Sequence, residues 1–304
     1  MSSVQSDIDL ETTSKQSQTE VARHEDAGNV CTVHGDVGLS SGNIRTPAPV
    51  HIHGDVSSGT SVFSGASVRV DGTVHDAVIS AGESINLTRG VRGSGRAIVR
   101  AKKNLETVFA ERAILLAVGD MRIMSSCVRC DIRCNSSVYM ERQKGRLVGG
   151  TVRARLGLEL RDLGSDRGIR TEVSFGQNYL LSDRIESEEK ELEKLKRSSA
   201  DLTRAMRQSD RGGAAKEFEQ MRKEKISLLH EIESKAFRIL TLREILEKHY
   251  PSKIVVHGTL FPGVVVESHG RFYGVKQPRK RVIISFNPTV GRIEEKPLPK
   301  GSRG

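Results

Sequence analysis

Short apolar runs recur at a nearly constant interval through the first half of the chain. The pattern aliphatic-x-Gly-x-Val occurs in Val33–Val37, Ile52–Val56 and Val70–Val74, whose first residues lie 19 and 18 residues apart, and a diverged copy begins 17 residues later at Leu87. A unit of about 18 residues is too short for a strand–helix–strand crossover, which needs roughly 30, but it suffices for one coil of a parallel solenoid. The spacing therefore predicts a parallel β-helix over residues 30–177.

Each coil is expected to contain short strands joined by tight, glycine-bearing turns. Because strand side chains alternate with a period of two, aliphatic side chains point inward, polar ones point outward, and stacked coils bury their apolar residues in ladders. A six-residue valine interval from Val50 to Val74 is typical of the left-handed helices of acyltransferases. The interval slips before Ile79 and the coil length varies from 17 to 19 residues, which favours the right-handed form.

At Tyr179 the apolar period changes from that of a strand to that of a helix. Heptad spacing then runs through two stripes, Leu181, Ile185, Leu192, Leu195, Leu202 and Met206, followed by Phe218, Met221, Leu228, Ile232, Ile239, Leu242 and Leu246. Glu188 and Ser199 fill the remaining positions of the first stripe, and Pro251 ends the second.

This pattern predicts an antiparallel α-helical coiled-coil hairpin over residues 178–250, inserted into the β-helix. Two helices of about 30 and 35 residues would be about 45 to 50 Å long at 1.5 Å per residue. The alternative is a hairpin that packs along its own solenoid as ordinary core.

The β pattern returns after Pro251. Residues 251–292 are expected to continue the β-helix, with Val282–Phe286 as the last strand and a flexible tail over residues 293–304. Residues 1–29 are rich in Ser, Thr, Gln and Glu. They cannot bury enough apolar surface to offset chain entropy, so we predict that they are disordered.

Composition supports a narrow solenoid in a reducing compartment. Trp is absent, aromatic residues make up 4% of the chain, and 29 of 304 residues are Gly. The sequence contains no run of 18 or more apolar residues and no apolar signal-peptide region, so we expect a cytoplasmic protein. The four cysteines are then expected to be free thiols.

Three of these cysteines, Cys127, Cys130 and Cys134, have a spacing that resembles that of cluster ligands. A tetrahedral site needs a fourth ligand, and Cys31 lies far away in the sequence. Small, buried cysteines are also ordinary core residues. We therefore predict no metal and no cofactor at this motif.

The net charge of +10 is unevenly distributed. Residues 1–30 carry −4, 31–176 carry +6, 177–250 carry +1 and 251–304 carry +7. A basic surface can attract nucleic acid, anionic lipid or an acidic protein. Few aromatic residues are available to stack on bases, which argues against single-stranded nucleic acid. A solvated exterior is the favoured interpretation, and peripheral membrane contact stays open.

Several glycines occur near the end of the first β region. Gly145 and the pair Gly149 and Gly150 are predicted to be structural turn residues, because glycine permits positive φ and close approach of backbones. Together with Lys144 they could cradle a phosphate, but no P-loop spacing is present.

Several of these segments resemble one known family. The matching residues are Lys144–Gly150, Leu163–Ser165, Thr171, Phe175–Gly176 and Phe261–Val264. With the position of the helical insertion, they resemble the flagellar assembly protein A family over about residues 33–298. The resemblance implies a right-handed β-helix, similar to bactofilins and to the β-helical domain of the division inhibitor MinC. It also implies a role in flagellar assembly or cell-pole organisation through protein contacts, without an agreed catalytic activity.

The chain departs from this family in one respect. Family members commonly carry a folded domain ahead of the β-helix, whereas about 30 residues precede it here. We expect a non-enzymatic scaffold with protein partners, possible self-association through the solenoid ends and a cytoplasmic or polar location. The candidate partner-binding residues lie at the hairpin turn and in a compact basic turn: Asp210, Arg211, Gly212 and Gly213, then Arg279, Lys280 and Arg281.

A β-helical enzyme of acyltransferase or lyase type is the alternative, with the nine histidines as general-base candidates. Four of them, His34, His51, His53 and His75, lie in or beside repeat strands, where outward, solvated positions explain them. No catalytic residue is therefore assigned.

Overall fold

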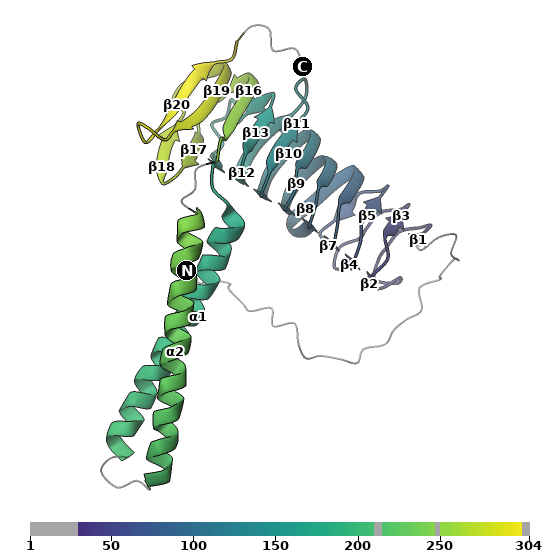
Figure 1. Ribbon diagram of the computed structural model, residues 1–304. Coiled ribbons are helices and arrows are strands. Elements are labelled where there is room, and N and C mark those ends of the chain that lie inside the picture. Colours follow the sequence, from purple (N-terminus) through teal and green to yellow (C-terminus); the bar gives the residue numbers. More distant parts are fainter. Residues whose placement is uncertain (1–29, 210–214, 247–249, 300–304) are drawn as a thin grey trace.

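A β solenoid and a helical hairpin make up the protein. The computed structural model describes residues 30–209, 215–246 and 250–299. Helices α1 (Tyr179–Ser209) and α2 (Ala215–Leu246) form a hairpin that projects from one end of the solenoid (Figure 1). The predicted parallel β solenoid with an inserted helical hairpin is confirmed, whereas the disorder predicted for residues 1–29 concerns residues outside the described part.

Three faces of parallel strands form the solenoid. Face 1 contains β1 (Cys31–Val33), β3 (Val50–Ile52), β5 (Val68–Val70), the first parts of β8 (Ile85–Ala101), β9 (Leu105–Ala117) and β10 (Met121–Cys134), and then β11 (Ser137–Met140), β13 (Gly157–Leu160) and β16 (Lys253–Leu260). Face 2 contains β6 (Val74–His75), the middle parts of β8 to β10, the start of β12 (Arg146–Ala154) and β14 (Asp162–Leu163). Face 3 contains β2 (Ile44–Thr46), β4 (Ser61–Ser64), β7 (Val78–Ala81), the last parts of β8, β9, β10 and β12, then β15 (Thr171–Phe175) and β17 (Val264–Ser268).

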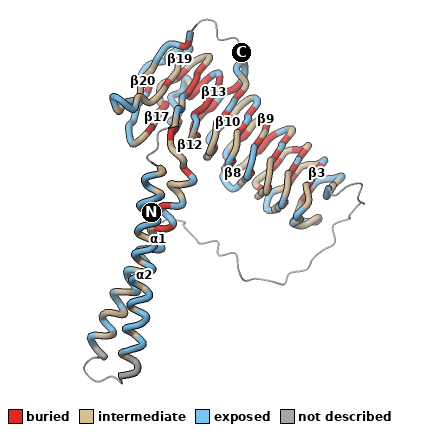
Figure 2. The backbone as a smooth tube through the Cα atoms, in the orientation of Figure 1, coloured by how far each residue is buried: buried red, intermediate tan, exposed pale blue. Residues whose placement is uncertain are grey.

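The pairing register reproduces the sequence repeat. Cys31 lies opposite Val50, Val50 opposite Val68, and Val68 opposite Ile85. On the same face, the inward side chains of Ile52, Val70 and Leu87 are at most 1% exposed. Each such aliphatic side chain contributes about 1.5 to 3 kcal/mol on burial. The buried positions follow the solenoid strands, whereas most of the hairpin is exposed or intermediate (Figure 2).

The glycine and aspartate of the repeated pattern have separate roles at the corner between face 1 and face 2. A Cβ on Gly54 would lie 2.5 Å from the carbonyl carbon and oxygen of Gly35 in the preceding coil, so the corners stack closely only without a side chain there. Asp36 Oδ1 accepts a hydrogen bond from the backbone N–H of Asp55 at 2.8 Å, and Asp55 Oδ1 accepts one from Thr73 at 2.7 Å. The aspartates therefore join successive coils.

The hairpin enters the solenoid between β15 and β16. Beyond it the solenoid closes again, because β16 pairs in parallel with β13, with Lys253 opposite Gly157. The root of the hairpin contacts the solenoid directly: the hydroxyl of Tyr179 donates to the carbonyl of Ala117 at 3.0 Å, and Arg133 Nη1 donates to Asp183 Oδ2 at 3.1 Å. Past this root the helices project away from the solenoid (Figure 1), so the hairpin is not ordinary solenoid core.

The last strands of the protein do not continue the parallel β-helix, although the sequence predicts that they do. Strands β16 and β17 continue the parallel coils, but β18 (Arg271–Gly274), β19 (Arg279–Asn287) and β20 (Arg292–Pro297) pair in antiparallel fashion on β17, β16 and β19. The chain reverses after β17 through His269 and Gly270, both at positive φ. We call these last three strands the antiparallel cap.

Three predictions about this end are therefore wrong. The β-helix does not continue to residue 292, Val282–Phe286 lies in β19 and is not the last strand, and residues 293–297 form most of β20 instead of a flexible tail. The reason is that alternation of apolar and polar side chains is the same in parallel and antiparallel strands, so it carries no information on strand direction.

Candidate partner-binding surface on the helical hairpin

The predicted seam of the hairpin is the least exposed face of both helices. Side chains at the heptad positions are buried or intermediate, including Ile185 at 7% and Ile239 at 5% exposed. The amide side chain of Asn178 accepts a hydrogen bond from Leu181 at 3.4 Å and so caps the start of α1. The two helices run antiparallel, because Glu188 near the start of α1 contacts Lys235 near the end of α2.

Charged side chains fix how α1 and α2 are aligned. Lys235 Nζ lies 2.8 Å from Glu188 Oε2 and also contacts Glu191, and Arg238 Nε lies 3.3 Å from Glu188 Oε1. The hydrogen bond from Lys235, helped by the charge of Arg238, lowers the pKa of Glu188. Because a shift of one helix by a turn would break these contacts, the polar pair at the seam specifies the alignment.

A row of large apolar side chains lies on the outer face of α2. Its members are Ile226, Leu229, Phe237 and Leu240, with exposed fractions of 49%, 45%, 73% and 58%. Their spacing of three, eight and three residues places them on one side of a helix that turns 100° per residue. This outer row is distinct from the seam, so the contact with α1 leaves it uncovered.

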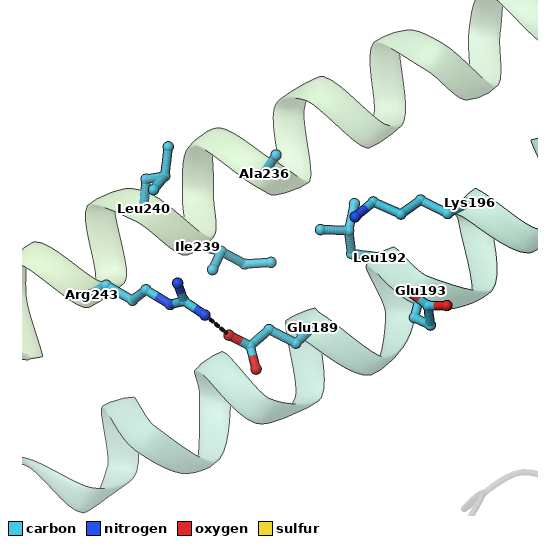
Figure 3. Close-up of a pocket in the computed structure, with 8 residues that line it drawn as sticks. All are labelled: Glu189, Leu192, Glu193, Lys196, Ala236, Ile239, Leu240 and Arg243. Carbon is cyan, nitrogen blue, oxygen red and sulfur yellow. Dashed lines mark hydrogen bonds and ion pairs between the residues drawn. The ribbon is translucent and has the colours of Figure 1, made fainter.

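A groove of about 380 Å³ lies between the helices beside this row (Figure 3). Leu192, Ala236 and Ile239 supply apolar side chains, and Leu240 belongs both to the groove and to the outer row. The other lining residues are charged: Glu189, Glu193, Lys196 and Arg243. Arg243 Nη2 pairs with Glu189 Oε1 across the groove at 2.5 Å. An apolar floor with charged edges suits a protein side chain or an amphipathic helix.

The predicted partner-binding residues form two groups. Asp210, Arg211, Gly212 and Gly213 fall outside the described residues. Arg279, Lys280 and Arg281 are exposed but form the first residues of β19 in the antiparallel cap, so the prediction of a compact basic turn is wrong.

The pairing of the basic segment with β16 contains a β-bulge at Arg281. Arg281 has φ 55°, and the register with β16 shifts at this point. Arg279 Nε lies 3.6 Å from Glu295 Oε1, and Arg281 Nη2 donates to the carbonyl of Pro299 at 3.2 Å. The cap lies at the root end of the hairpin, so the basic residues and the outer ends of the helices do not form one surface (Figure 1).

Of the three predicted turn glycines, one lies just before β12 and two lie within it. Gly145 follows a turn and its N–H donates to the carbonyl of Glu141 at 2.6 Å. Gly149 and Gly150 both have positive φ, as predicted, and lie inside β12, where the strand bends from face 2 to face 3.

The cysteines of the cluster-like motif are buried in the solenoid core. Cys127, Cys130 and Cys134 are at most 2% exposed, and Cys134 Sγ donates to the carbonyls of Gly119 and Ser137 at 3.1 and 3.3 Å. Burial raises the pKa of Cys134 to about 12. These positions are those of core residues within stacked strands.

Sequence reasoning missed one group of side chains. His51, His53 and Asp71 come together on the exterior of face 1, with their potential metal-binding atoms within 4.8 Å of one another. The signal was present in the repeat, because His34, His53 and Asp71 are the second residues of its first three copies. Hydrogen bonds from His51 and then Arg69 lower the pKa of Asp71 to about 2.

Within the described ranges, neither helix is apolar enough over a sufficient length to cross a membrane.

Comparison with known proteins agrees with the architecture. The sequence model of the family described as Flagellar Assembly Protein A beta solenoid domain matches residues 29–291, which is most of the chain. No curated protein and no solved structure gives a match. The family is not one of known enzymes, and its description suggests a role in flagellar assembly. The chain belongs to the flagellar assembly protein A β-solenoid family.

Proposed function

We propose that this protein is a non-enzymatic scaffold in flagellar assembly, and that its hairpin binds an amphipathic helix of a partner protein. The solenoid is the rigid body that positions the hairpin, and the outer row with the adjoining groove is the contact surface. In this proposal the hairpin is a coiled coil, the β-helix is right-handed, and the protein works in the cytoplasm, including the cell pole. Self-association and contact with anionic lipid remain secondary proposals.

The observation that carries this proposal is the outer row of α2. Four large apolar side chains, of which Phe237 is 73% exposed, lie on one face of a helix that projects from the body of the molecule. Apolar rows of this kind commonly mark protein-binding sites. Charged side chains at the groove edges, including Lys196 and Arg243, would orient a partner helix of complementary charge.

The test is a double substitution, Phe237→Glu with Leu240→Glu, introduced into cells in place of the native gene. Both side chains point to solvent, so the protein should fold normally, with unchanged helical circular dichroism. Removing a hot-spot side chain at the centre of a protein interface costs about 2 kcal/mol or more. We therefore expect fewer flagellated cells and a several-fold smaller swimming halo in soft agar.

The matched control is Leu39→Glu. Leu39 is 85% exposed but lies at the opposite end of the molecule, in the first coil of the solenoid. This variant should swim like the wild type. Normal flagellation in the double variant, or an equal defect in the control, would contradict the assignment of the contact surface to α2.

A further inference from the structure

The exterior of face 1 brings together two imidazoles and a carboxylate from neighbouring coils. Ile52 of β3 pairs with Val70 of β5, which places His53 beside Asp71, one residue further along each coil. His51 Nε2 lies 2.7 Å from Asp71 Oδ2, and His53 Nδ1 lies 3.1 Å from the same oxygen. The three side chains therefore converge on one point outside the solenoid.

The backbone holds these positions firmly. The N–H of His53 donates to the carbonyl of Val33 at 3.0 Å, and the N–H of Asp71 donates to the carbonyl of Ile52 at 2.8 Å. Both residues are thus tied to the coil before them, in the hydrogen-bonding pattern of the solenoid. His51 lies within β3, and His53 and Asp71 directly follow the last residues of β3 and β5, so the positions of all three depend on the paired strands.

Neighbouring side chains orient the three groups further. Arg69 Nε donates to Asp71 Oδ1 at 2.9 Å, so the other carboxylate oxygen, Oδ2, turns toward the imidazoles. The ring of His34 stacks on that of His53 with centroids 5.2 Å apart and an interplanar angle of 11°. Such outer contacts are what usually fix the orientation of metal ligands.

The chemistry of the donor set matches one class of ligand. Two imidazole nitrogens and one carboxylate oxygen are a common donor set for Zn²⁺ and related divalent transition metals. Tetrahedral Zn²⁺ with bonds of about 2.0 to 2.2 Å separates its donor atoms by about 3.3 to 3.5 Å. The two contacts to Asp71 Oδ2, at 2.7 and 3.1 Å, are a fraction of an ångström shorter than this separation, and the two imidazole nitrogens lie within 4.8 Å of each other.

The three side chains are partly exposed to solvent. The side chains of His51, His53 and Asp71 are 28%, 41% and 26% exposed, so water reaches the point where they meet. Three protein ligands with water in the remaining position are a frequent arrangement for zinc. In such a complex the metal ion takes the place of the protons that the imidazoles share with Oδ2.

We propose that His51, His53 and Asp71 form a binding site for one Zn²⁺ ion on the exterior of the first coils of the solenoid. The site is independent of the hairpin, which emerges from the other end of the solenoid (Figure 1). Its ligands come from two successive coils, so the ion joins them outside the hydrogen-bonded strands.

The experiment is a titration of the full chain, freed of any histidine tag, with ZnCl₂ in a calorimeter at neutral pH. We expect one high-affinity ion per chain. Asp71→Asn keeps the size of the side chain, but it removes the anionic ligand and one of the two oxygen acceptors. This variant and His53→Ala should each bind Zn²⁺ at least about 10-fold more weakly.

The matched control is His75→Ala. His75 is also an outward histidine of the solenoid, with a side chain 38% exposed, but its nearest carboxylate is that of Asp55 at 3.9 Å. This variant should bind like the wild type. Equal affinity in the wild type and Asp71→Asn, or equal weakening in His75→Ala, would overturn the proposal.

A second measurement does not depend on the variants. Co²⁺ added to the wild type should give the visible absorption of a low-coordinate ion with nitrogen ligands, and Zn²⁺ should displace it at one equivalent. A spectrum no different from that of Co²⁺ in buffer would also overturn the proposal.

Discussion

At the scale of single residues, close stacking of coils decides which side chains are allowed. Gly150 shows this most clearly: it has φ 81°, and a Cβ there would collide with the backbone of Cys130 in the preceding coil. The sequence indicated that this glycine is special. It could not say which atoms make it so, because Cys130 becomes its neighbour only when the coils stack.

We predict that Gly150→Ala destabilises the protein by about 2 kcal/mol or more, from left-handed strain of roughly 1 to 2 kcal/mol plus the displaced backbone. Gly42→Ala is the control, since Gly42 also has positive φ (74°) but nothing within 4 Å of its added Cβ. Urea unfolding of both variants measures the difference. Equal destabilisation would mean that backbone strain, not the neighbouring coil, is the cause.

At the scale of elements, the hairpin combines an apolar seam with a polar pair inside it. Glu188 is 9% exposed and is held by Lys235 and Arg238. Replacing one partner of such a pair leaves the other poorly solvated, which is why the pair favours one alignment of α1 and α2. Heptad spacing revealed both stripes, and it placed Glu188 in the seam, but it did not identify Lys235 as the partner.

The pair predicts a pH dependence. The pKa of Glu188 is lowered in the folded protein, so its contribution to stability is present above the ordinary glutamate value of 4.5 and is lost as the pH falls through the lowered folded value. We expect Glu188→Gln to melt at a lower temperature than the wild type at pH 7, followed by circular dichroism at 222 nm. The gap should shrink progressively below pH 4.5. A gap that stays constant down to pH 2 would contradict this role.

At the scale of the whole molecule, the solenoid and the hairpin are separable parts. The strands on both sides of the insertion pair with each other, with Gly157 opposite Lys253 and Val173 opposite Val266. The antiparallel cap adds β18, β19 and β20 to the last coil. Adding strands in the reverse direction occupies strand edges that would otherwise be open to another chain.

We therefore predict that the solenoid folds without the hairpin. Replacing Tyr179–Tyr250 by a short flexible linker should keep the β-type circular dichroism and a single cooperative unfolding transition, while removing the helical signal. Some loss of stability is expected, because the contacts of Tyr179 with Ala117 and of Arg155 with Tyr250 disappear. An insoluble or unfolded product would show that the hairpin is part of the folding unit.

The family, the β solenoid and the position of the two helices could be predicted from the sequence. The family followed from the resemblance of segments such as Lys144–Gly150 and Phe261–Val264. The solenoid and the helices follow from patterns that are local or repeated at short range: the interval from Val33 to Ile52 to Val70, and the heptad stripes from Leu181 onward. Stacked strands and paired helices both require such patterns, so the pattern alone is strong evidence for them.

The outer row of α2 was the part of the candidate surface that we did not predict from the sequence. Ile226, Leu229, Phe237 and Leu240 fall outside the heptad stripe of α2, but only the packing of α2 on α1 shows how far their side chains are exposed. The predicted tip residues fall outside the described part of the chain, and the predicted basic turn proved to be a strand.

The sequence by itself determined the coil length, the ladders of inward apolar side chains and the helical insertion, because the spacing of apolar residues directly shows the period of a strand or a helix. Tertiary structure alone decided the direction of the cap strands, the outward face of α2 and the meeting of His51, His53 and Asp71. Those features depend on which coil or helix lies beside which. Which coils and helices become neighbours is fixed by the stacking register and by the packing of residues far apart in the chain, not by any local period.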